Sequence, residues 1–348
     1  MEDRYVAYAG SYTRGESEGI YIMDLDMTGR PSFKIRDAFK INNPSHMQIS
    51  ADGKFLYTCF DGGVAALRIL EDGGLEMMNT ASVNGLRPAA ICVDKENRFL
   101  LSGGYHDGKL TVVKIHKSGK VGEVCDEVFM KGLGSVGARH YHSHISSVRF
   151  TPDEKYAIAV DLGMDLATIF AINRETGKLK RHSVIRCDLE SGPRDLVFSH
   201  NGKFAYLLHE YGNYVTQYAY EAEGAVFMPI QKFSTLPPDY KNYNSAIRLE
   251  LSDDDKHLFA CNSGNNSVAI YEIEPESGQM QHLCVLPVSG EFPCDTLLLP
   301  DGIHFASVNQ ESSSITSFKI NYENGFFVMD GKPVDLPSPT CIRLHKLS

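Results

Sequence analysis

The sequence lacks any extended cluster of basic residues, and this absence excludes one broad class of partner. Its 34 lysine and arginine residues are outnumbered by 44 aspartate and glutamate residues, so the formal net charge at pH 7 is −10. Domains that bind nucleic acid present a basic patch or stripe to the phosphate backbone. We therefore expect no nucleic-acid partner, and an anionic small substrate would need local arginine or histidine side chains to overcome the negative field.

Long apolar runs are also missing. No stretch reaches the roughly 20 consecutive apolar residues that a membrane-spanning helix needs, and residues 1–6 show neither a basic start nor an apolar core. The eight cysteines are scattered without a Cys-x-x-Cys motif, which favours free thiols in a reducing compartment over disulfides or a zinc site. The sequence thus predicts a cytoplasmic protein with no membrane segment, no catalytic metal and no other cofactor.

Two motifs of large enzyme classes are absent as well. The chain contains no Gly-x-x-x-x-Gly-Lys-Ser/Thr loop and no His-Glu-x-x-His pair. The first motif cradles nucleotide phosphates, and the second places two histidines and a general base at a catalytic zinc ion. The sequence therefore does not support P-loop nucleotide chemistry or zinc-dependent proteolysis.

What the sequence does contain is one short pattern repeated six times. Each copy has an apolar run, a tight turn with Asp or Asn, a basic or histidine residue, and a second apolar run. The copies cover residues 47–57, 91–101, 148–158, 196–206, 249–259 and 297–307. A third alternating run, a glycine turn and a fourth run follow each copy, and four strands repeating at steps of 44 to 57 residues predict a β-propeller.

The two ends of the chain complete the pattern. Residues 4–41 match the second to fourth strands of such a unit without a first strand, and residues 339–345 match a first strand with nothing after it. Joining them adds a seventh blade and closes the ring, which removes the exposed sheet edges of an open stack. We therefore predict an all-β, seven-bladed β-propeller with four strands per blade, as a single domain over residues 1–348.

Further motifs stand at irregular positions between the repeats. They include Gly-Ser-Tyr-Thr at 10–13, Gly-Gly-Val-Ala-Ala at 62–66, Asp-Leu-Gly at 161–163, Ser-Gly-Pro-Arg at 191–194 and Phe-Ser-Thr-Leu-Pro at 233–237. Together they resemble the lactonase family of seven-bladed propellers, which takes in propeller-type 6-phosphogluconolactonase and the 3-carboxymuconate lactonizing enzymes. The resemblance extends over essentially the whole chain.

This resemblance implies a site at the mouth of the central channel with a His, a Glu and an Arg as its catalytic set. The matching residues are His144, Glu210 and Arg194. Lactone hydrolysis needs a base to activate water and donors for the tetrahedral oxyanion. We expect His144 to be the base, Glu210 to orient it or to be the base itself, and Arg194 to hold a carboxylate or the oxyanion.

The same resemblance implies a wider lining that contacts the substrate. The candidate substrate-binding residues are Tyr12, Arg14, His46, Tyr105, His142, Asp161, Arg248, Cys294, Gln310 and Arg343. Some of these have a structural alternative: Asp161 precedes Leu-Gly and can anchor a turn, and Cys294 is expected only to line the channel. The alternating His140, His142 and His144 resemble a metal tract, but no acidic or cysteine ligand stands beside them.

The chain departs from the family pattern at several of these positions. Ser146 stands where the second histidine of a His-x-His pair is usual, Ser263 and Cys294 stand where arginines are common, and Arg248 replaces a usual carboxylate. An anionic group would then be bound differently, or the substrate is not the phosphorylated sugar lactone.

Three functions remain open at this point. The first is a hydrolase of a sugar-acid or related carboxylate lactone, the second a muconate-type cycloisomerase that uses the same residues for proton transfer, and the third a non-catalytic propeller that binds a ligand or protein. The expected partner in the first two cases is a small lactone or carboxylate, and the sequence carries no signal of an oligomeric state.

Overall fold

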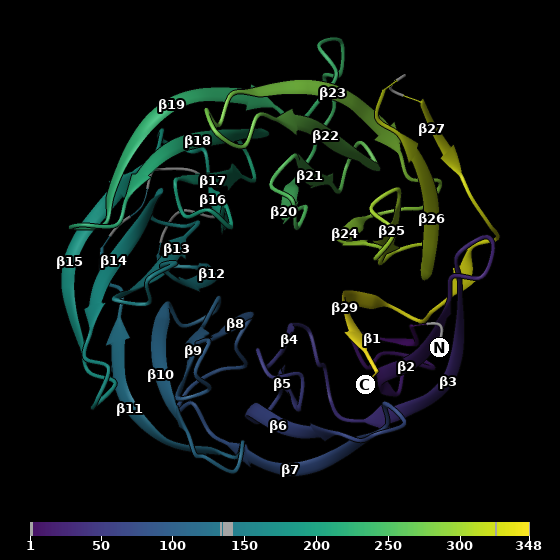
Figure 1. Ribbon diagram of the computed structural model, residues 1–348. Coiled ribbons are helices and arrows are strands. Elements are labelled where there is room, and N and C mark those ends of the chain that lie inside the picture. Colours follow the sequence, from purple (N-terminus) through teal and green to yellow (C-terminus); the bar gives the residue numbers. More distant parts are fainter. Residues whose placement is uncertain (1–2, 133, 135–141, 324–325, 348) are drawn as a thin grey trace. The chain divides into compact units, whose positions relative to one another are not determined.

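The computed structural model describes residues 3–132, 134, 142–323 and 326–347 of the chain. Its regular elements there are β-strands, and this part of the chain contains no helix long and apolar enough to span a membrane. Over the described residues the strands form seven antiparallel sheets (Figure 1). This strand order confirms the seven-bladed β-propeller predicted from the repeats.

The repeated turns are held by the side chains that the sequence pattern places there. Asp52 accepts hydrogen bonds from the Ser50 hydroxyl at 2.6 Å and from the backbone N–H of Lys54 at 3.2 Å. The pairs Thr151–Asp153, Ser199–Asn201 and Ser252–Asp254 repeat this contact. Short polar side chains stabilise such turns because they satisfy backbone donors that have no strand partner.

The closing sheet confirms the prediction made from the two ends of the chain. β29 (Pro339–Lys346) pairs with β1 (Tyr5–Ser11), and the sheet continues through β2 (Gly19–Asp26) and β3 (Ser32–Lys40). Gly10 lies where this sheet approaches the backbone of the next segment, since a Cβ there would come within 2.1 Å of the Pro44 carbonyl oxygen. The two termini thus contribute strands to one blade.

The chain divides into two compact units, and each is described by itself. The first unit comprises residues 1–47, 69–75 and 235–348. Besides the closing sheet it holds two sheets whose innermost strands, β20 and β24, contact each other, and β24 also contacts β29. Their strands are β20 (Ala246–Leu251), β21 (His257–Asn262), β22 (Ser267–Ile273), β23 (Met280–Pro287), β24 (Pro293–Leu298), β25 (His304–Asn309), β26 (Ser314–Asn321), β27 (Phe326–Met329) and β28 (Val334–Asp335).

The last of these sheets differs from the prediction of four strands per blade. Its outermost strand is broken into β27 and β28, which both pair with β26 and make the sheet five-stranded. Residues between these two strands, such as Asp330, form no ladder with β26 beyond the backbone bond from Asp330 N–H to the Ser317 carbonyl at 2.8 Å. The interruption affects the outer edge and leaves the inner strands regular.

The second unit comprises residues 48–68 and 76–234. It holds three complete sheets and most of a fourth, and the innermost strands β8, β12 and β16 contact one another in turn. The strands are β4 (Met47–Ile49), β5 (Phe55–Phe60), β6 (Gly63–Ile69), β7 (Leu75–Ala81), β8 (Ala90–Val93), β9 (Phe99–Gly103), β10 (Lys109–Ile115), β11 (Val121–Phe129), β12 (Ile145–Phe150), β13 (Tyr156–Asp161), β14 (Leu166–Ile172), β15 (Leu179–Arg186), β16 (Pro193–Phe198), β17 (Phe204–His209), β18 (Tyr214–Glu221) and β19 (Val226–Ser234).

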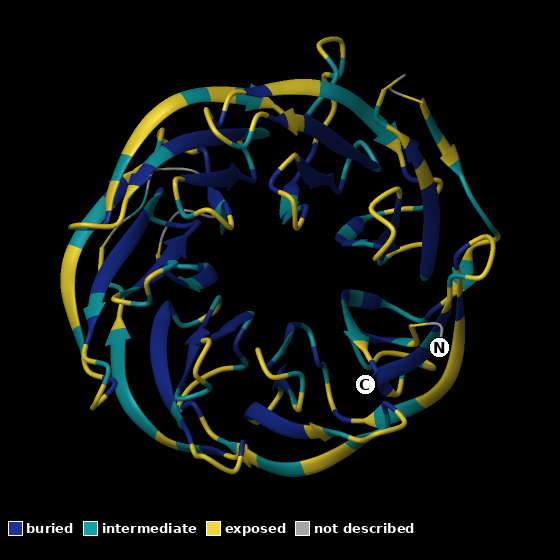
Figure 2. Cartoon of the chain, viewed as in Figure 1, coloured by how far each residue is buried: buried dark blue, intermediate teal, exposed yellow. Residues whose placement is uncertain are grey.

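Burial follows strand position within each sheet (Figure 2). The second strands are almost wholly buried, whereas the outermost strands alternate between exposed and half-buried residues. Apolar side chains of neighbouring sheets fill the space between them, as where Ile158 and Val160 meet Leu196 and Leu207. The second strands end on buried polar residues, including Asp161 and His209, and such residues need partners that position the loops beyond them.

Candidate functional site

His144 lies just before β12, and its ring is oriented by one specific hydrogen bond. Nδ1 is 2.6 Å from the backbone carbonyl oxygen of Tyr105, and the ring stacks on the Tyr105 ring at a centroid distance of 4.6 Å. A carbonyl oxygen only accepts, so Nδ1 carries the proton and Nε2 of the neutral ring is the acceptor. Burial lowers the pKa of His144 below its ordinary value of 6.5, which keeps the ring neutral at neutral pH.

Asp161 fixes the backbone that carries His144. Its carboxylate is fully buried at the end of β13 and accepts the Ser143 hydroxyl at 2.5 Å, the His144 N–H at 2.8 Å and the Met164 N–H at 3.2 Å. Burial raises the pKa of Asp161, and these donors oppose that rise. The arrangement fits the structural alternative, in which Asp161 anchors the turn and positions His144.

Arg194 and Glu210 form an ion pair near the start of β16 and the end of β17. Arg194 Nη1 is 3.3 Å from Glu210 Oε2, and the Glu210 side chain is 6% exposed. The backbone N–H of Glu210 donates to the Gly192 carbonyl at 2.7 Å, which ties both residues to the same loop. The Tyr105 carbonyl accepts the Nδ1 proton of His144 and so sets the tautomer of that ring. Glu210 forms its ion pair with Arg194 instead.

Tyr105 connects the two halves of this group. Its ring stacks on His144 on one side, and the guanidinium carbon of Arg194 lies 5.8 Å from the ring centroid. The exposed His142 adds a ring 4.2 Å from that of His144. Tyr105 thus contacts both His144 and Arg194. The six predicted site residues of the second unit that lie in this neighbourhood are Tyr105, His142, His144, Asp161, Arg194 and Glu210.

Ser146, which stands where the family usually has a second histidine, has a structural role. Its hydroxyl donates to the carbonyl oxygens of Arg194 at 2.8 Å and Pro193 at 3.2 Å. This contact joins β12 to the start of β16. His140 lies outside the described residues. Within the described part of the chain, no group of three or more His, Cys, Asp or Glu side chains is arranged to hold a metal ion.

A second polar group belongs to the first unit and is centred on Asp295. This buried carboxylate accepts Arg248 Nε at 3.0 Å and Arg343 Nη1 at 2.8 Å. Arg248 Nη1 also lies 3.2 Å from His46 Nε2, and Arg343 Nε donates to the Met47 carbonyl at 2.9 Å. Three predicted site residues therefore meet here, and two guanidinium groups share one carboxylate, which leaves a net positive charge.

Asp295 itself was missed from the sequence, although a signal was present. The triplets Pro193-Arg-Asp195 and Pro293-Cys-Asp295 place an aspartate at the same position of two first strands. In the second unit Asp195 accepts Arg149 Nη2 at 2.9 Å and the Ser147 hydroxyl at 2.8 Å. The shared Pro-x-Asp spacing thus marks a buried carboxylate that anchors arginines of neighbouring first strands.

The remaining predicted residues of the first unit are Tyr12, Arg14, Cys294 and Gln310. The Arg14 guanidinium carbon is 5.5 Å from the Tyr12 ring centroid, and Gln310 is half-buried just after β25. The Cys294 Sγ atom lies 3.4 Å from the carbonyl oxygens of Val308 and Pro339. Burial raises the pKa of the Cys294 thiol well above its ordinary value, so it carries no thiolate at neutral pH.

The seven antiparallel sheets define the class of the protein as a seven-bladed β-propeller. The chain belongs to the family described as "Lactonase, 7-bladed beta-propeller", which matches residues 6–344. This finding confirms the resemblance drawn from the motifs.

Named relatives agree with this assignment. The chain is 28% identical over 350 residues to the 6-phosphogluconolactonase of Bacillus subtilis, with 99% of both chains covered. It is 28% identical over 331 residues to the 6-phosphogluconolactonase of Formosa agariphila, with 91% of this chain and 93% of that protein covered. The structure of the periplasmic gluconolactonase of Pseudomonas aeruginosa superimposes with a TM-score of 0.94 at 24% identity, covering 99% of this chain and 100% of the other. At that identity the structural likeness concerns the fold.

Proposed function

We propose that the protein hydrolyses a lactone of a sugar acid or a related carboxylic acid. Membership of the lactonase family and the two named 6-phosphogluconolactonases support this class of reaction. The observation that carries the proposal is the hydrogen bond from His144 Nδ1 to the Tyr105 carbonyl. It leaves Nε2 as the acceptor of a neutral ring, which is the state that a general base requires.

In the proposed reaction, His144 Nε2 takes a proton from a water molecule as that water attacks the lactone carbonyl carbon. The carbonyl oxygen becomes an oxyanion in the tetrahedral intermediate, and Arg194 is the donor that stabilises it or holds a substrate carboxylate. The bond to the ring oxygen then breaks, and His144 returns its proton to that oxygen. The product is one open-chain hydroxy acid, whose carboxylic acid group then releases its proton to solvent and becomes a carboxylate. Glu210 orients Arg194 throughout.

An anionic lactone is the substrate class to test first. Within the second unit, the Arg194 guanidinium carbon lies 5.8 Å from the centroid of the Tyr105 ring that stacks on His144, and the two named relatives are 6-phosphogluconolactonases. A guanidinium group can hold a phosphate or a carboxylate through two parallel hydrogen bonds.

The test is a proton-release assay on a lactone panel, corrected for spontaneous hydrolysis. The panel contains 6-phosphoglucono-1,5-lactone, glucono-1,5-lactone and a carboxylated butenolide. We expect His144→Gln to lower kcat about 10²- to 10⁴-fold, the usual contribution of a general base. His116→Gln, which changes an exposed histidine outside this group, is the matched control. Unchanged turnover of every accepted lactone by His144→Gln would refute the proposal.

Labelled water separates hydrolysis from the alternatives. In water enriched in ¹⁸O, hydrolysis introduces one label into the product carboxylate, whereas a cycloisomerase exchanges solvent hydrogen without taking up oxygen. Binding of a panel lactone with no turnover would instead support a non-catalytic propeller. Because burial lowers the pKa of His144, the acid limb of kcat/KM for the free enzyme should lie below the ordinary histidine value of 6.5.

A further inference from the structure

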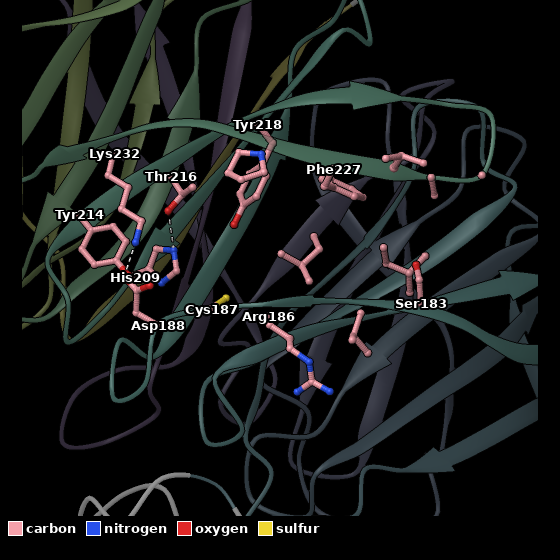
Figure 3. Close-up of a pocket in the computed structure, with 17 residues that line it drawn as sticks. Ser183, Arg186, Cys187, Asp188, His209, Tyr214, Thr216, Tyr218, Phe227 and Lys232 are labelled. Atoms are coloured by element: carbon pink, nitrogen blue, oxygen red, sulfur yellow. Dashed lines mark hydrogen bonds and ion pairs between the residues drawn. The ribbon is translucent and has the colours of Figure 1, made fainter.

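The second unit contains a cavity that the proposed catalytic group does not use. It has a volume of about 460 Å³ and lies between strands β14 and β15 of one sheet and strands β18 and β19 of the next, with His209 at the end of β17 also in its lining (Figure 3). His209 lines it, and the following residue in the chain is Glu210, whose side chain pairs with Arg194 instead. The volume is within the range of sites that hold small organic ligands.

One end of this cavity is polar and compact. Lys232 Nζ pairs with the Asp188 carboxylate, the Tyr214 hydroxyl donates to Asp188 Oδ2 at 2.7 Å, and Lys232 Nζ lies 4.9 Å from the Tyr214 ring centroid. His209 stacks on Tyr214 at 4.2 Å and contacts the Thr216 hydroxyl through Nε2 at 3.0 Å. Figure 3 shows these side chains gathered at one side of the cavity.

The other end is apolar and aromatic. Figure 3 shows Phe227 on the side away from Lys232, and Tyr218 between the two ends. Ile169 and Ile185 also line the cavity and belong to the same apolar cluster as Tyr218 and Phe227. A ligand that fits both ends therefore has an apolar or aromatic body and one polar group.

The charges of the lining decide the sign of that polar group. Among the lining side chains Lys232 and the exposed Arg186 are cationic and Asp188 is anionic, so the ionised side chains of the whole lining sum to +1. Burial lowers the pKa of His209 to about 3 and raises the pKa of the Cys187 thiol to about 12, so neither carries charge at neutral pH. The Arg186 guanidinium points away from the Lys232–Asp188 pair (Figure 3), which leaves Lys232 as the direct partner of an anion.

The Lys232–Asp188 pair does not prevent Lys232 from binding an anion. Their side chains are 48% and 58% exposed, and an exposed ion pair contributes little to stability. The ammonium group has three donors, so it can contact a ligand carboxylate while it remains beside Asp188.

We propose that this cavity binds an organic monocarboxylate with an aromatic or apolar body, with the carboxylate on Lys232 and the body against the wall formed by Tyr218 and Phe227, whose rings contact each other edge to face at a centroid distance of 6.0 Å. The proposal does not depend on lactone hydrolysis, because the cavity shares no side chain with the His144 group. It adds a second small-molecule site to the protein.

Isothermal titration calorimetry of the full chain with 2-naphthoate tests the proposal. We expect saturable binding of one naphthoate per chain. Two ligands separate the contributions: 2-naphthamide has the same body without the charge, and gluconate has the charge without an apolar body. Both should bind at least about fivefold more weakly, since each lacks one of the two complementary ends. Equal affinity for naphthoate and naphthamide would overturn the charge assignment.

Four variants locate the binding. Lys232→Met should weaken naphthoate binding about five- to tenfold, as expected for the loss of one charge-assisted contact at a partly exposed position, and Lys232→Arg should restore most of it. Lys180→Met removes an exposed lysine from β15 outside the cavity and should have no effect. Arg194→Met tests whether naphthoate occupies the proposed catalytic group. Loss of binding in Arg194→Met with retention in Lys232→Met would refute the proposal.

Discussion

Acidification should destabilise this protein through His209, a fully buried histidine in the second unit. Its Nδ1 and Nε2 atoms contact the hydroxyls of Ser191 and Thr216, each at 3.0 Å, and its ring stacks on Tyr214. Burial is the main cause that lowers its pKa to about 3, with Lys232 adding to the shift and Asp188 opposing it. The folded protein therefore keeps this ring neutral at pH values where the unfolded chain binds a proton.

The size of the effect follows from proton linkage. An unfolded histidine has a pKa of about 6.5, and between that value and about 3 the unfolded state holds one proton more than the folded state. Stability consequently falls as the pH falls, by about 1.4 kcal/mol for each pH unit below about 6.5. Between about pH 7 and pH 5, His209 alone should lower the free energy of unfolding by about 2 kcal/mol.

The assay compares wild type with His209→Gln, which keeps an amide donor and acceptor and does not titrate. Urea unfolding is followed by circular dichroism, because the chain has no tryptophan to report by fluorescence. The variant should be less stable at pH 7, since it loses the stacking on Tyr214, but its stability should fall less on acidification. The difference between the two pH dependences isolates His209 from the other groups. Equal dependences, within about 0.5 kcal/mol, would contradict the reasoning.

Two further substitutions test other parts of the structure. Asp295→Ala removes the carboxylate shared by Arg248 and Arg343, whose side chains are 14% and 20% exposed. The free energy of unfolding should then fall by about 3 to 5 kcal/mol, because two buried charges lose their partner. A loss under about 1 kcal/mol in urea unfolding would refute the anchoring role of Asp295. Gly163→Ala would place a Cβ 2.0 Å from the His142 carbonyl oxygen and 2.9 Å from His144 Cδ2. Lactone turnover should then fall about 10- to 100-fold, whereas Gly29→Ala, which meets no atom within 4 Å, should retain it; equal kcat values would show that Gly163 does not position His144.

Much of the fold could be predicted because its signals are local. Turns such as Ser50–Asp52 recur in four of the six repeats, and in the first of them Asp52 satisfies a backbone donor two residues away. In the second copy Asp94 takes over this task, accepting the N–H groups of Arg98 and Phe99 at 2.6 and 2.8 Å, although that turn has Glu at position 96. The break between β27 and β28 was not predicted, since an outer edge strand is constrained by only one neighbour.

The site was predicted only in part, because its contacts join residues that are distant along the chain. The choice of His144, Arg194 and Glu210 came from motif resemblance, and their roles remain predictions. The sequence left open whether Glu210 orients the histidine. In the structure Glu210 pairs with Arg194, and the Tyr105 carbonyl accepts the hydrogen bond from His144 Nδ1. Nothing in the local sequence connects position 105 with position 144.

The sequence by itself determined the repeating architecture, since alternating apolar runs and turn residues specify strands and hairpins through neighbours in the chain. It also determined the closing sheet, because an unmatched first strand at residues 339–345 has only one sheet to complete. Tertiary structure alone decided which polar side chains meet. His209 and Glu210 are adjacent in sequence, yet one lines the outer cavity and the other pairs with Arg194. Successive side chains of a strand point to opposite faces of its sheet, so the packing of neighbouring sheets gives them different surroundings.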